Sequence, residues 1–191
     1  MTAAPSLPPA TRDAIMDAAA RIFAREGYRA ATIQAIASEA GFTPPTVYSH
    51  FGSKLGLFEA LVEALLADLF AVLERQLPDG LTLAQSLELR VRELLELAAR
   101  RRAMFTLLVL RPYDLPDLEG HEDDEVRLDA YWGVLFDAHA DELGDRTPHE
   151  AGLVMEGVLY AFTKSWMRSD EPSLAPQTRR IVELVLTGVR G

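Results

Sequence analysis

Apolar residues recur along most of this chain at intervals of three and four positions, which is the period of an α-helix that buries one face. The first segment of this kind has a five-residue apolar face: Ile15, Ala18, Ala19, Ile22 and Phe23. Gly27 is typical of a position just past a helix end, so this helix should stop there. Thr32 is a suitable cap for a short second helix, which Gly41 should end.

The same spacing, together with the positions of glycine and proline, predicts seven further helices. They span about residues 44–51, 54–73, 83–99, 103–110, 123–143, 149–168 and 177–189, with a turn at 78–80 and a loop at 111–120. Thr82 is the expected cap of the helix over 83–99. The sequence has no strand-like alternation, internal repeat or coiled-coil heptad. It therefore predicts an all-α protein of about nine helices.

Two consecutive prolines open the third predicted helix, in the stretch GFTPPTVYSHFGSK. Proline is tolerated in a first helical turn because the N–H groups there have no partner inside the helix and the fixed φ suits it. Thr43 precedes the prolines, and we expect its hydroxyl to cap the helix by accepting from the amide of Thr46. Pro44 and Pro45 therefore mark a helix start rather than a break.

The sides of this short helix differ in chemistry. Val47 and Phe51 are four residues apart and should face inward. The remaining positions carry hydrogen-bonding side chains, and a lysine follows at the start of the next helix: Thr46, Tyr48, Ser49, His50 and Lys54. Such a helix suits contacts with phosphates and base edges. With the preceding helix and the glycine turn it forms a candidate helix-turn-helix, the alternative being a plain helical corner.

The charge of the chain is unevenly distributed. The 191 residues carry a net charge of −10, but residues 1–55 hold five cations against four anions, a balance of +1, and the remainder has a balance of −11. A near-neutral head on an acidic body suggests two functions and two domains. Cysteine is absent, which excludes disulfides, zinc–thiolate sites and cysteine nucleophiles.

The first ten residues are small and rich in proline, and we expect them to form a disordered arm. They lack the cationic start and apolar middle of a signal peptide. The apolar run between Arg102 and Arg111 is far shorter than the roughly 18 residues that a membrane span needs. These features predict a cytoplasmic protein without a membrane partner.

The segment from Ala31 to Leu57 closely resembles the DNA-binding signature of the TetR family of bacterial transcriptional regulators. In that family a threonine opens the second helix, a glycine makes the turn, and Tyr-x-His-Phe followed by lysine closes the unit. The matching residues here are Thr32, Gly41, Tyr48, His50, Phe51 and Lys54. The close resemblance covers about residues 11–58, and many positions agree in order and spacing.

The resemblance implies an N-terminal helix-turn-helix domain over residues 11–54 and a larger helical ligand-binding and dimerisation domain over residues 55–191. It implies phosphate contacts from Tyr48, His50 and Lys54. It places a second group at the operator: Gln34, Thr43, Pro44, Pro45, Thr46 and Ser49. Pro44 departs from the polar or small residue that the family usually has, and its ring could pack on a thymine methyl group.

An aromatic cluster in the C-terminal part is the candidate ligand site. The nine residues expected there are Phe105, Leu108, Tyr131, Trp132, Phe136, Met155, Leu159, Phe162 and Trp166. They suit a small, largely apolar effector, because such pockets are mostly apolar with a few polar tips. The alternative is that these residues form an ordinary core, and the sequence does not divide the two groups.

The last two predicted helices have apolar residues on more than one face, which indicates two surfaces to bury. We expect a homodimer interface from Val154, Val158, Ala161, Ile181, Leu184 and Val185, the alternative being that both helices are central in a monomer. A dimer places two recognition helices about 34–36 Å apart on a palindromic operator. An effector that tilts the helix from Lys54 would change that spacing and release the repressor.

Two other classes of protein are alternatives to a DNA-binding regulator. An enzyme or metal protein has little support: residues 149–153 lack the second histidine of a helical zinc pair, and the acidic run 121–125 suits a helix start better than a cation site. We expect no enzymatic activity, no cofactor and no metal. The second alternative is an all-α protein-interaction adaptor, which would need no DNA-facing helix.

Overall fold

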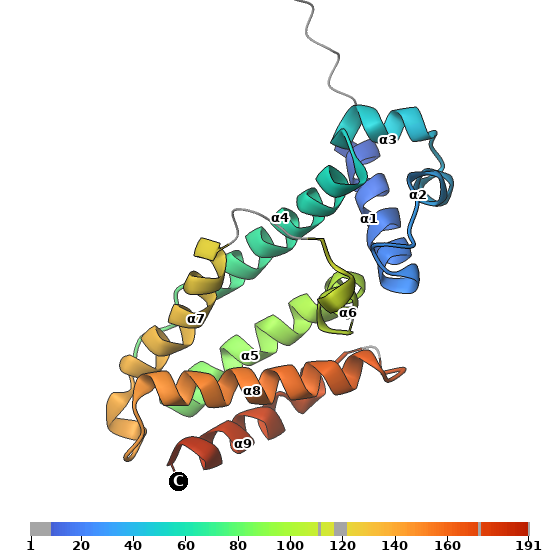
Figure 1. Cartoon of the computed structure of the whole chain (residues 1–191). Helices are drawn as coiled ribbons and strands as arrows, with labels where there is room; N and C mark the ends of the chain where they lie inside the picture. The colour runs from blue at the N-terminus through green and yellow to red at the C-terminus, as the bar shows by residue number, and fades with distance from the viewer. Residues whose placement is uncertain (1–8, 111, 117–121, 172, 191) are drawn as a thin grey trace, which may run out of the picture. The chain divides into compact units, whose positions relative to one another are not determined.

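The computed structural model describes residues 9–110, 112–116, 122–171 and 173–190. Over these ranges the chain forms nine α-helices and three short 3₁₀ turns, without a β-strand (Figure 1). The helices are α1 (Pro9–Glu26), α2 (Ile33–Ala40), α3 (Pro44–Phe51), α4 (Lys54–Leu73), α5 (Leu83–Arg100), α6 (Arg102–Leu110), α7 (Glu122–Asp137), α8 (Pro148–Met167) and α9 (Thr178–Arg190). The all-α prediction is confirmed.

The chain divides into two compact units that do not follow each other as single blocks. The first unit holds residues 1–65 and 103–117, so it contains α1 to α3, the first turns of α4, and most of α6. The second holds residues 66–102 and 118–191, with the end of α4 and helices α5 and α7 to α9. The division at residue 55 that the sequence predicts would leave α6 in the C-terminal domain, whereas in the structure residues 103–117 group with the N-terminal helices.

Helix α2 is fixed at both ends by local chemistry. The hydroxyl of Thr32 accepts a hydrogen bond from the amide of Ala35 at 3.1 Å, as predicted. Gly41 has a φ of 76°, and the amides of Gly41 and Phe42 donate to the carbonyls of Ser38 and Ala37, which is the Schellman arrangement. The chain therefore leaves α2 in a defined direction toward α3.

The corner between α3 and α4 depends on two residues that the sequence patterns did not single out. The hydroxyl of Ser53 accepts from the amide of Gly56 at 2.9 Å and caps α4. A Cβ atom on Gly56 would lie 2.3 Å from the carbonyl oxygen of Phe51, so only glycine fits at this close approach. A serine three residues before a helical glycine is the sequence signal that could have located this cap.

The core of the first unit joins α1, α2, α3 and the start of α4. Its centre is an aromatic group in which the ring of Phe58 lies 5.7 Å from Phe23 and 5.1 Å from Tyr28. Burial, followed by the negative charge of Glu59, raises the pKa of the Tyr28 hydroxyl. The five residues predicted inward from α1 are buried, as are Ile33, Ile36 and Ala37 of α2, and Val47 anchors α3 to this core.

In the second unit, α5 and α8 begin with capping boxes. Thr82 and Gln85 exchange hydrogen bonds at the start of α5, where a cap was predicted. Thr147 and Glu150 do the same at α8, and Pro148 is the first helical residue rather than part of the preceding loop. These bonds hold the pKa of Glu150 below its ordinary value, first through the backbone N–H and then through the hydroxyl of Thr147.

Helix α7 ends at Asp137, six residues earlier than the sequence pattern predicts. The cause is a set of contacts with a part of the chain that is distant in sequence. Beyond the helix, the carboxylate of Glu142 accepts from the amide of Leu83 at 2.8 Å, and the imidazole of His139 lies 3.1 Å from the hydroxyl of Ser86. Both groups tie this segment to the start of α5, and residues 140–142 form a 3₁₀ turn.

At the chain start, α1 begins at Pro9, so the expected arm retains only residues 1–8, which lie outside the described residues. The expected loop at 111–120 contains a 3₁₀ turn at Pro112–Asp114. Residues 111 and 117–120 of that loop are also outside the described range. Among the helices of the described ranges, none is long and apolar enough to cross a membrane.

Candidate nucleic-acid interface

Helix α3 starts at Pro44 and ends at Phe51, as predicted, but its cap differs from the expectation. The Thr43 hydroxyl makes no bond to a backbone N–H; it lies 3.0 Å from the hydroxyl of Thr46. The amide of Thr46 instead donates to the carbonyl of Thr43 at 2.9 Å. Because Pro44 and Pro45 have no N–H, Thr46 carries the first amide of the helix, and a backbone acceptor takes it.

The outer side of α3 presents three kinds of chemical group. Pro45, Tyr48 and Ser49 are exposed, and half of the Tyr48 surface is accessible. The Ser49 hydroxyl donates to the carbonyl of Thr46 at 2.8 Å, which leaves its oxygen as an acceptor. Pro44 and Thr46 are half-buried. The exposed part of α3 is therefore a proline ring, a phenol and a hydroxyl, carried on a helix that Val47 holds in place.

His50 does not lie on this outer side in the way the sequence predicts. It is half-buried, and its Nε2 atom is buried without a hydrogen-bond partner. Its ring centre lies 5.9 Å from that of Phe51, so the imidazole packs at the edge of the core. The Nε2 atom would need a change of side-chain conformation to meet a phosphate.

Lys54 is committed to the protein itself. Its ammonium donates to three backbone carbonyls, those of Tyr28 at 3.0 Å, Arg29 at 3.2 Å and Ala31 at 3.0 Å. It also lies 4.6 Å from the centre of the Tyr28 ring. An ammonium has three protons, and all three are used. The phosphate contact expected from the sequence would have to replace bonds that hold the loop between α1 and α2.

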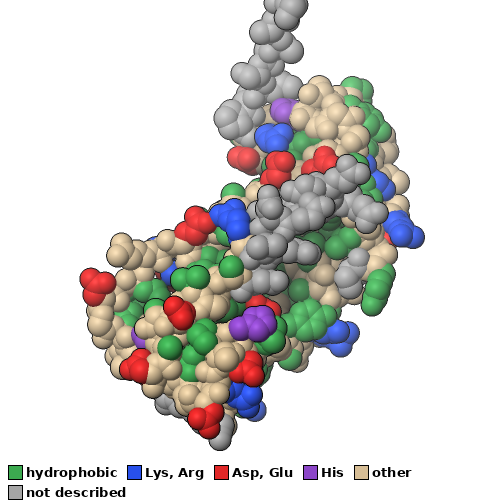
Figure 2. Space-filling view, turned by 60° about the vertical axis from the view of Figure 1, so that its left-hand side comes forward, with side chains coloured by type: hydrophobic (Ala, Val, Ile, Leu, Met, Phe, Trp, Pro, Cys, Tyr) green, Lys and Arg blue, Asp and Glu red, His purple; other side chains and the backbone are tan. Residues whose placement is uncertain are grey.

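Two further residues complete the picture around α3. Gln34 is exposed on α2, where a second DNA contact was expected. Arg12 of α1, which sequence patterns did not single out, places its guanidinium 4.6 Å from the centre of the Phe51 ring. On the face shown in Figure 2, positive and negative side chains are interspersed.

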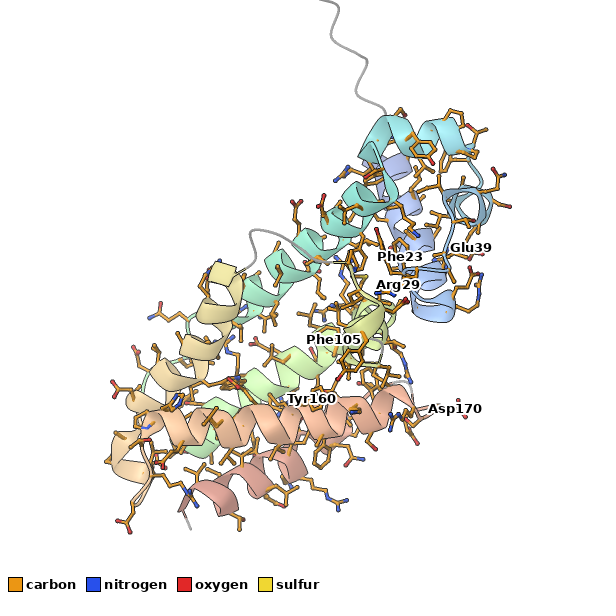
Figure 3. The ribbon with its side chains drawn as sticks, viewed as in Figure 1. Phe23, Arg29, Glu39, Phe105, Tyr160 and Asp170 are labelled. Atoms are coloured by element: carbon orange, nitrogen blue, oxygen red, sulfur yellow. The ribbon has the colours of Figure 1, made fainter. Side chains whose placement is uncertain are left out.

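The nine residues expected to form one ligand pocket are distributed over several environments. Phe105 and Leu108 lie on α6 in the first unit, where Phe105 is labelled in Figure 3, and the other seven lie in the second. Four of those seven are buried and Leu159 is half-buried: the buried residues are Trp132, Phe136, Met155 and Trp166. The nine residues therefore do not share one environment.

Two cavities of the second unit contain the remaining aromatics. One, of about 450 Å³, lies between the end of α8 and the start of α9, and Phe162, Trp166 and Arg180 are among its lining residues. The other, of about 250 Å³, is lined by Tyr131 and Val134 of α7 and by Phe70 and Leu73 of α4. Burial raises the pKa of Tyr131, against an opposing effect of Arg90.

The residues expected at a dimer interface fall into two groups, those packed within the chain and those exposed on its surface. Ile181 and Val185 are fully buried within the chain, so their assignment to a dimer surface is wrong. Val154 also packs internally: one of its methyl groups would lie 3.1 Å from a Cβ built on Gly188. The physical reason is that α8 and α9 pack on each other and use these faces. Ala161 and Leu184 are exposed, and Val158 is half-buried.

The outer surfaces of α8 and α9 carry large apolar residues, of which the sequence patterns predicted only Leu184 at an interface. Leu153, Tyr160 and Leu184 are each about half exposed, and Tyr160 is labelled on α8 in Figure 3. With Ala161 they form what we call the α8–α9 outer face. Among the described residues there is no cluster of metal-binding side chains, and the side chains of the acidic run 121–125 lie outside that range.

Comparison with known proteins finds a family model that matches the N-terminal part of the chain. Residues 15–61 match the model described as bacterial regulatory proteins, tetR family. The HTH-type transcriptional repressor KstR2 of Rhodococcus jostii is 35% identical over 77 residues, which are 40% of this chain and 38% of that protein. The HTH-type transcriptional activator FasR of Mycolicibacterium smegmatis is 24% identical over 164 residues, 84% of this chain and 74% of that protein. The chain spans 54% and 38% of the length of the first curated relatives it matches.

A solved structure extends the likeness over nearly the whole chain. The transcriptional regulator FadR of Bacillus subtilis, in complex with stearoyl-CoA, has a TM-score of 0.74 at 17% identity and covers 93% of this chain and 98% of that one. At this identity the likeness shows the fold. The predicted architecture, an N-terminal helix-turn-helix followed by a helical body, is confirmed.

Proposed function

The chain belongs to the TetR family of bacterial regulatory proteins, and from this premise we propose that it is a transcriptional repressor that binds a palindromic operator as a homodimer. TetR-family regulators bind DNA and are not enzymes, in line with the names of the relatives. The observation that supports this proposal best is the exposed side of α3, where Pro45, Tyr48 and Ser49 stand on a helix anchored by Val47. A regulator of this kind works at the nucleoid.

Helix α3 would enter the major groove with this exposed side. Tyr48 would donate its hydroxyl to a phosphate, which positions the helix without reading sequence. Pro45, the more exposed of the two prolines, has no donor, so it would contact the methyl group of a thymine. Thr43, Thr46 and Ser49 would supply short polar groups near the base edges.

Dimerisation would use the α8–α9 outer face, because it leaves three large apolar side chains half exposed on packed helices. Exposed apolar patches rimmed by polar groups are common at protein interfaces. The test is the oligomeric state in analytical ultracentrifugation. Leu184→Glu combined with Tyr160→Glu should give monomers, whereas Val134→Glu, at an exposed apolar site on α7, should leave the dimer intact.

The effector would be a small, largely apolar molecule. The stearoyl-CoA complex of the Bacillus subtilis regulator supports this class. The cavity lined by Phe70, Leu73 and Tyr131 is suitable because it touches the last turns of α4, the helix that starts beside α3. A ligand that binds more tightly to a tilted α4 would shift the population away from the DNA-binding state.

Fluorescence anisotropy with DNA from upstream of the gene tests the proposal. We expect specific binding to a palindrome and release by apolar acyl compounds. Tyr48→Phe should weaken binding to all sequences alike, whereas Thr46→Ala should change sequence preference. Absence of binding to any DNA would overturn the proposal and favour a protein-interaction adaptor. A reporter that loses expression when the protein is deleted would show activation instead of repression.

A further inference from the structure

The N-terminal head, residues 9–65, has five lysine and arginine side chains, and four of them already have partners in the protein. Arg21 pairs with Glu39 at 3.1 Å, and Arg25 with Glu26 at 2.9 Å. Arg29 lies 3.8 Å from Asp114, and Lys54 donates to three carbonyls. Each engaged cation has lower capacity to neutralise a phosphate, because that contact would replace an existing one.

Arg12 is the exception. Its side chain is exposed, and no carboxylate of the described residues lies within 4.0 Å of it. Its contact is with the ring of Phe51, 4.6 Å from the guanidinium carbon.

This contact places Arg12 at the end of the recognition helix. Phe51 is the last residue of α3 and lies three positions after Tyr48, on the neighbouring turn. In Figure 1 the beginning of α1 lies next to the end of α3. A guanidinium that stacks on an aromatic ring keeps its N–H donors in the plane of the group and free at its edge. The ring therefore holds the charge in place without using its donors.

We propose that Arg12 supplies the cationic phosphate contact beside α3, the role that the sequence assigns to Lys54. The inference rests on the proposed function, since it concerns the same DNA interface. Arginine suits this role because its planar fork binds phosphate oxygens in a bidentate manner. Lys54 then acts as a positioning residue that holds the loop between α1 and α2.

The test uses the salt dependence of DNA binding by the full-length protein. Each phosphate neutralised contributes about 0.9 to the slope of log affinity against log salt. Anisotropy titrations between 50 and 200 mM salt would use the operator duplex and a duplex of unrelated sequence. Arg12→Gln should lower the slope by about 0.9 per head and the affinity roughly tenfold per head at low salt, equally for both duplexes.

Matched variants separate this role from a structural one. Arg12→Lys should retain most of the slope, because the charge is kept. Arg21→Gln removes an exposed cation of the same helix that is paired with Glu39, and it should leave the slope nearly unchanged. Circular dichroism melting of each variant identifies any that is partly unfolded, and a slope counts only for folded protein.

The outcomes are distinct. If the wild type binds DNA and Arg12→Gln keeps the full slope, the inference about Arg12 is wrong and the proposed function stands. If Lys54→Met lowers the slope instead, without loss of thermal stability, Lys54 is the phosphate contact and the assignment is reversed. If the wild type binds neither duplex, the proposed function itself fails.

Discussion

In each of the two units a cationic side chain donates hydrogen bonds to backbone carbonyls at or beyond the end of a helix, but the side chains differ. A helix ends with backbone carbonyls that have no partner inside the helix. In the first unit the ammonium of Lys54 donates to carbonyls of the loop after α1, and in the second the guanidinium of Arg90 donates to those of Val72 at the end of α4 and Arg75 just beyond it. Arg102 similarly donates to the carbonyls of Trp166 at the end of α8 and of Ser169 and Glu171 beyond it.

The difference between the units lies in burial and in consequence. Lys54 is half-buried beside the candidate DNA surface, whereas Arg90 is 1% exposed and its Nε atom has no partner. In the second unit the buried guanidinium of Arg90 has a structural role. In the first, a phosphate contact by a cation that already binds a carbonyl or carboxylate would replace an existing interaction. A lysine of a DNA-binding motif can thus have a structural role. Which cations are available to bind phosphate follows from the contacts that each of them makes in the structure.

The sharpest test of the first unit is the corner between α3 and α4. Gly56→Ala places a methyl group in contact with the Phe51 carbonyl, so the corner must move. We expect a loss of about 3 kcal/mol in the free energy of unfolding, at the upper end for overpacking. Urea denaturation measures it. Gly133→Ala, within α7 and with open space at its Cβ, is the control and should be neutral or gain up to about 1 kcal/mol.

The matching test of the second unit is Arg90→Met. This change leaves the carbonyls of Val72 and Arg75 without their donor and Glu93 without one of its partners. We expect a loss of about 3 kcal/mol, typical for removal of one partner of a buried ion pair. Arg92→Met, an exposed position on the same helix, should change stability by less than about 0.5 kcal/mol. Equal effects of the two variants would show that the buried cluster does not stabilise the unit.

Lys54→Met tests whether the ammonium of this lysine stabilises the fold or binds a DNA phosphate. If the ammonium holds the loop after α1, the free protein should lose about 2 kcal/mol, since a hydrogen bond to a charged group contributes about 1.5–3 kcal/mol. Thermal unfolding without DNA measures this. Lys54→Arg should not restore the loss, because a planar guanidinium does not match three converging carbonyls. Unchanged stability together with weaker DNA binding would contradict the structural role.

The helix caps give a smaller contrast. Thr147 caps α8 with a full capping box, whereas Thr43 makes no bond to an amide of α3. Thr147→Ala should therefore cost about 1 kcal/mol, and Thr43→Ala clearly less. Because the pKa of Glu150 is lowered, the capping contribution of its carboxylate is present above its ordinary pKa and lost as pH falls through the lowered value. Urea titrations at neutral and acidic pH measure both effects, and a larger loss for Thr43→Ala would reverse the comparison.

Sequence patterns predicted well where the determinants are local. The caps Thr32 and Thr82, the αL position at Gly41 and the limits of α3 all follow from residues within one turn. Sequence patterns predicted poorly where a hydrogen bond to a distant part of the chain decides where a helix ends. Helix α7 ends early because Glu142 and His139 bond to the start of α5, and nothing within α7 signals this.

The same reason separates the correct from the incorrect parts of the candidate sites. Amphipathic spacing shows that α8 and α9 have two apolar faces, but it does not say which face meets the neighbouring helix. The structure places Ile181 and Val185 in that contact and leaves Leu153, Tyr160 and Leu184 outside. Likewise, aromatic composition alone does not distinguish Trp132 in the core from Tyr131 at a cavity.

The sequence by itself determined the helical class, the helix-turn-helix and the start of α3 at Pro44, because backbone chemistry and hydrophobic periodicity act over a few residues. Tertiary structure alone decided which polar groups are free: it placed the Lys54 ammonium on three carbonyls and the Arg12 guanidinium on the Phe51 ring. The availability of a charge depends on the acceptors around it. For Lys54 those acceptors lie 23 to 26 residues away along the chain.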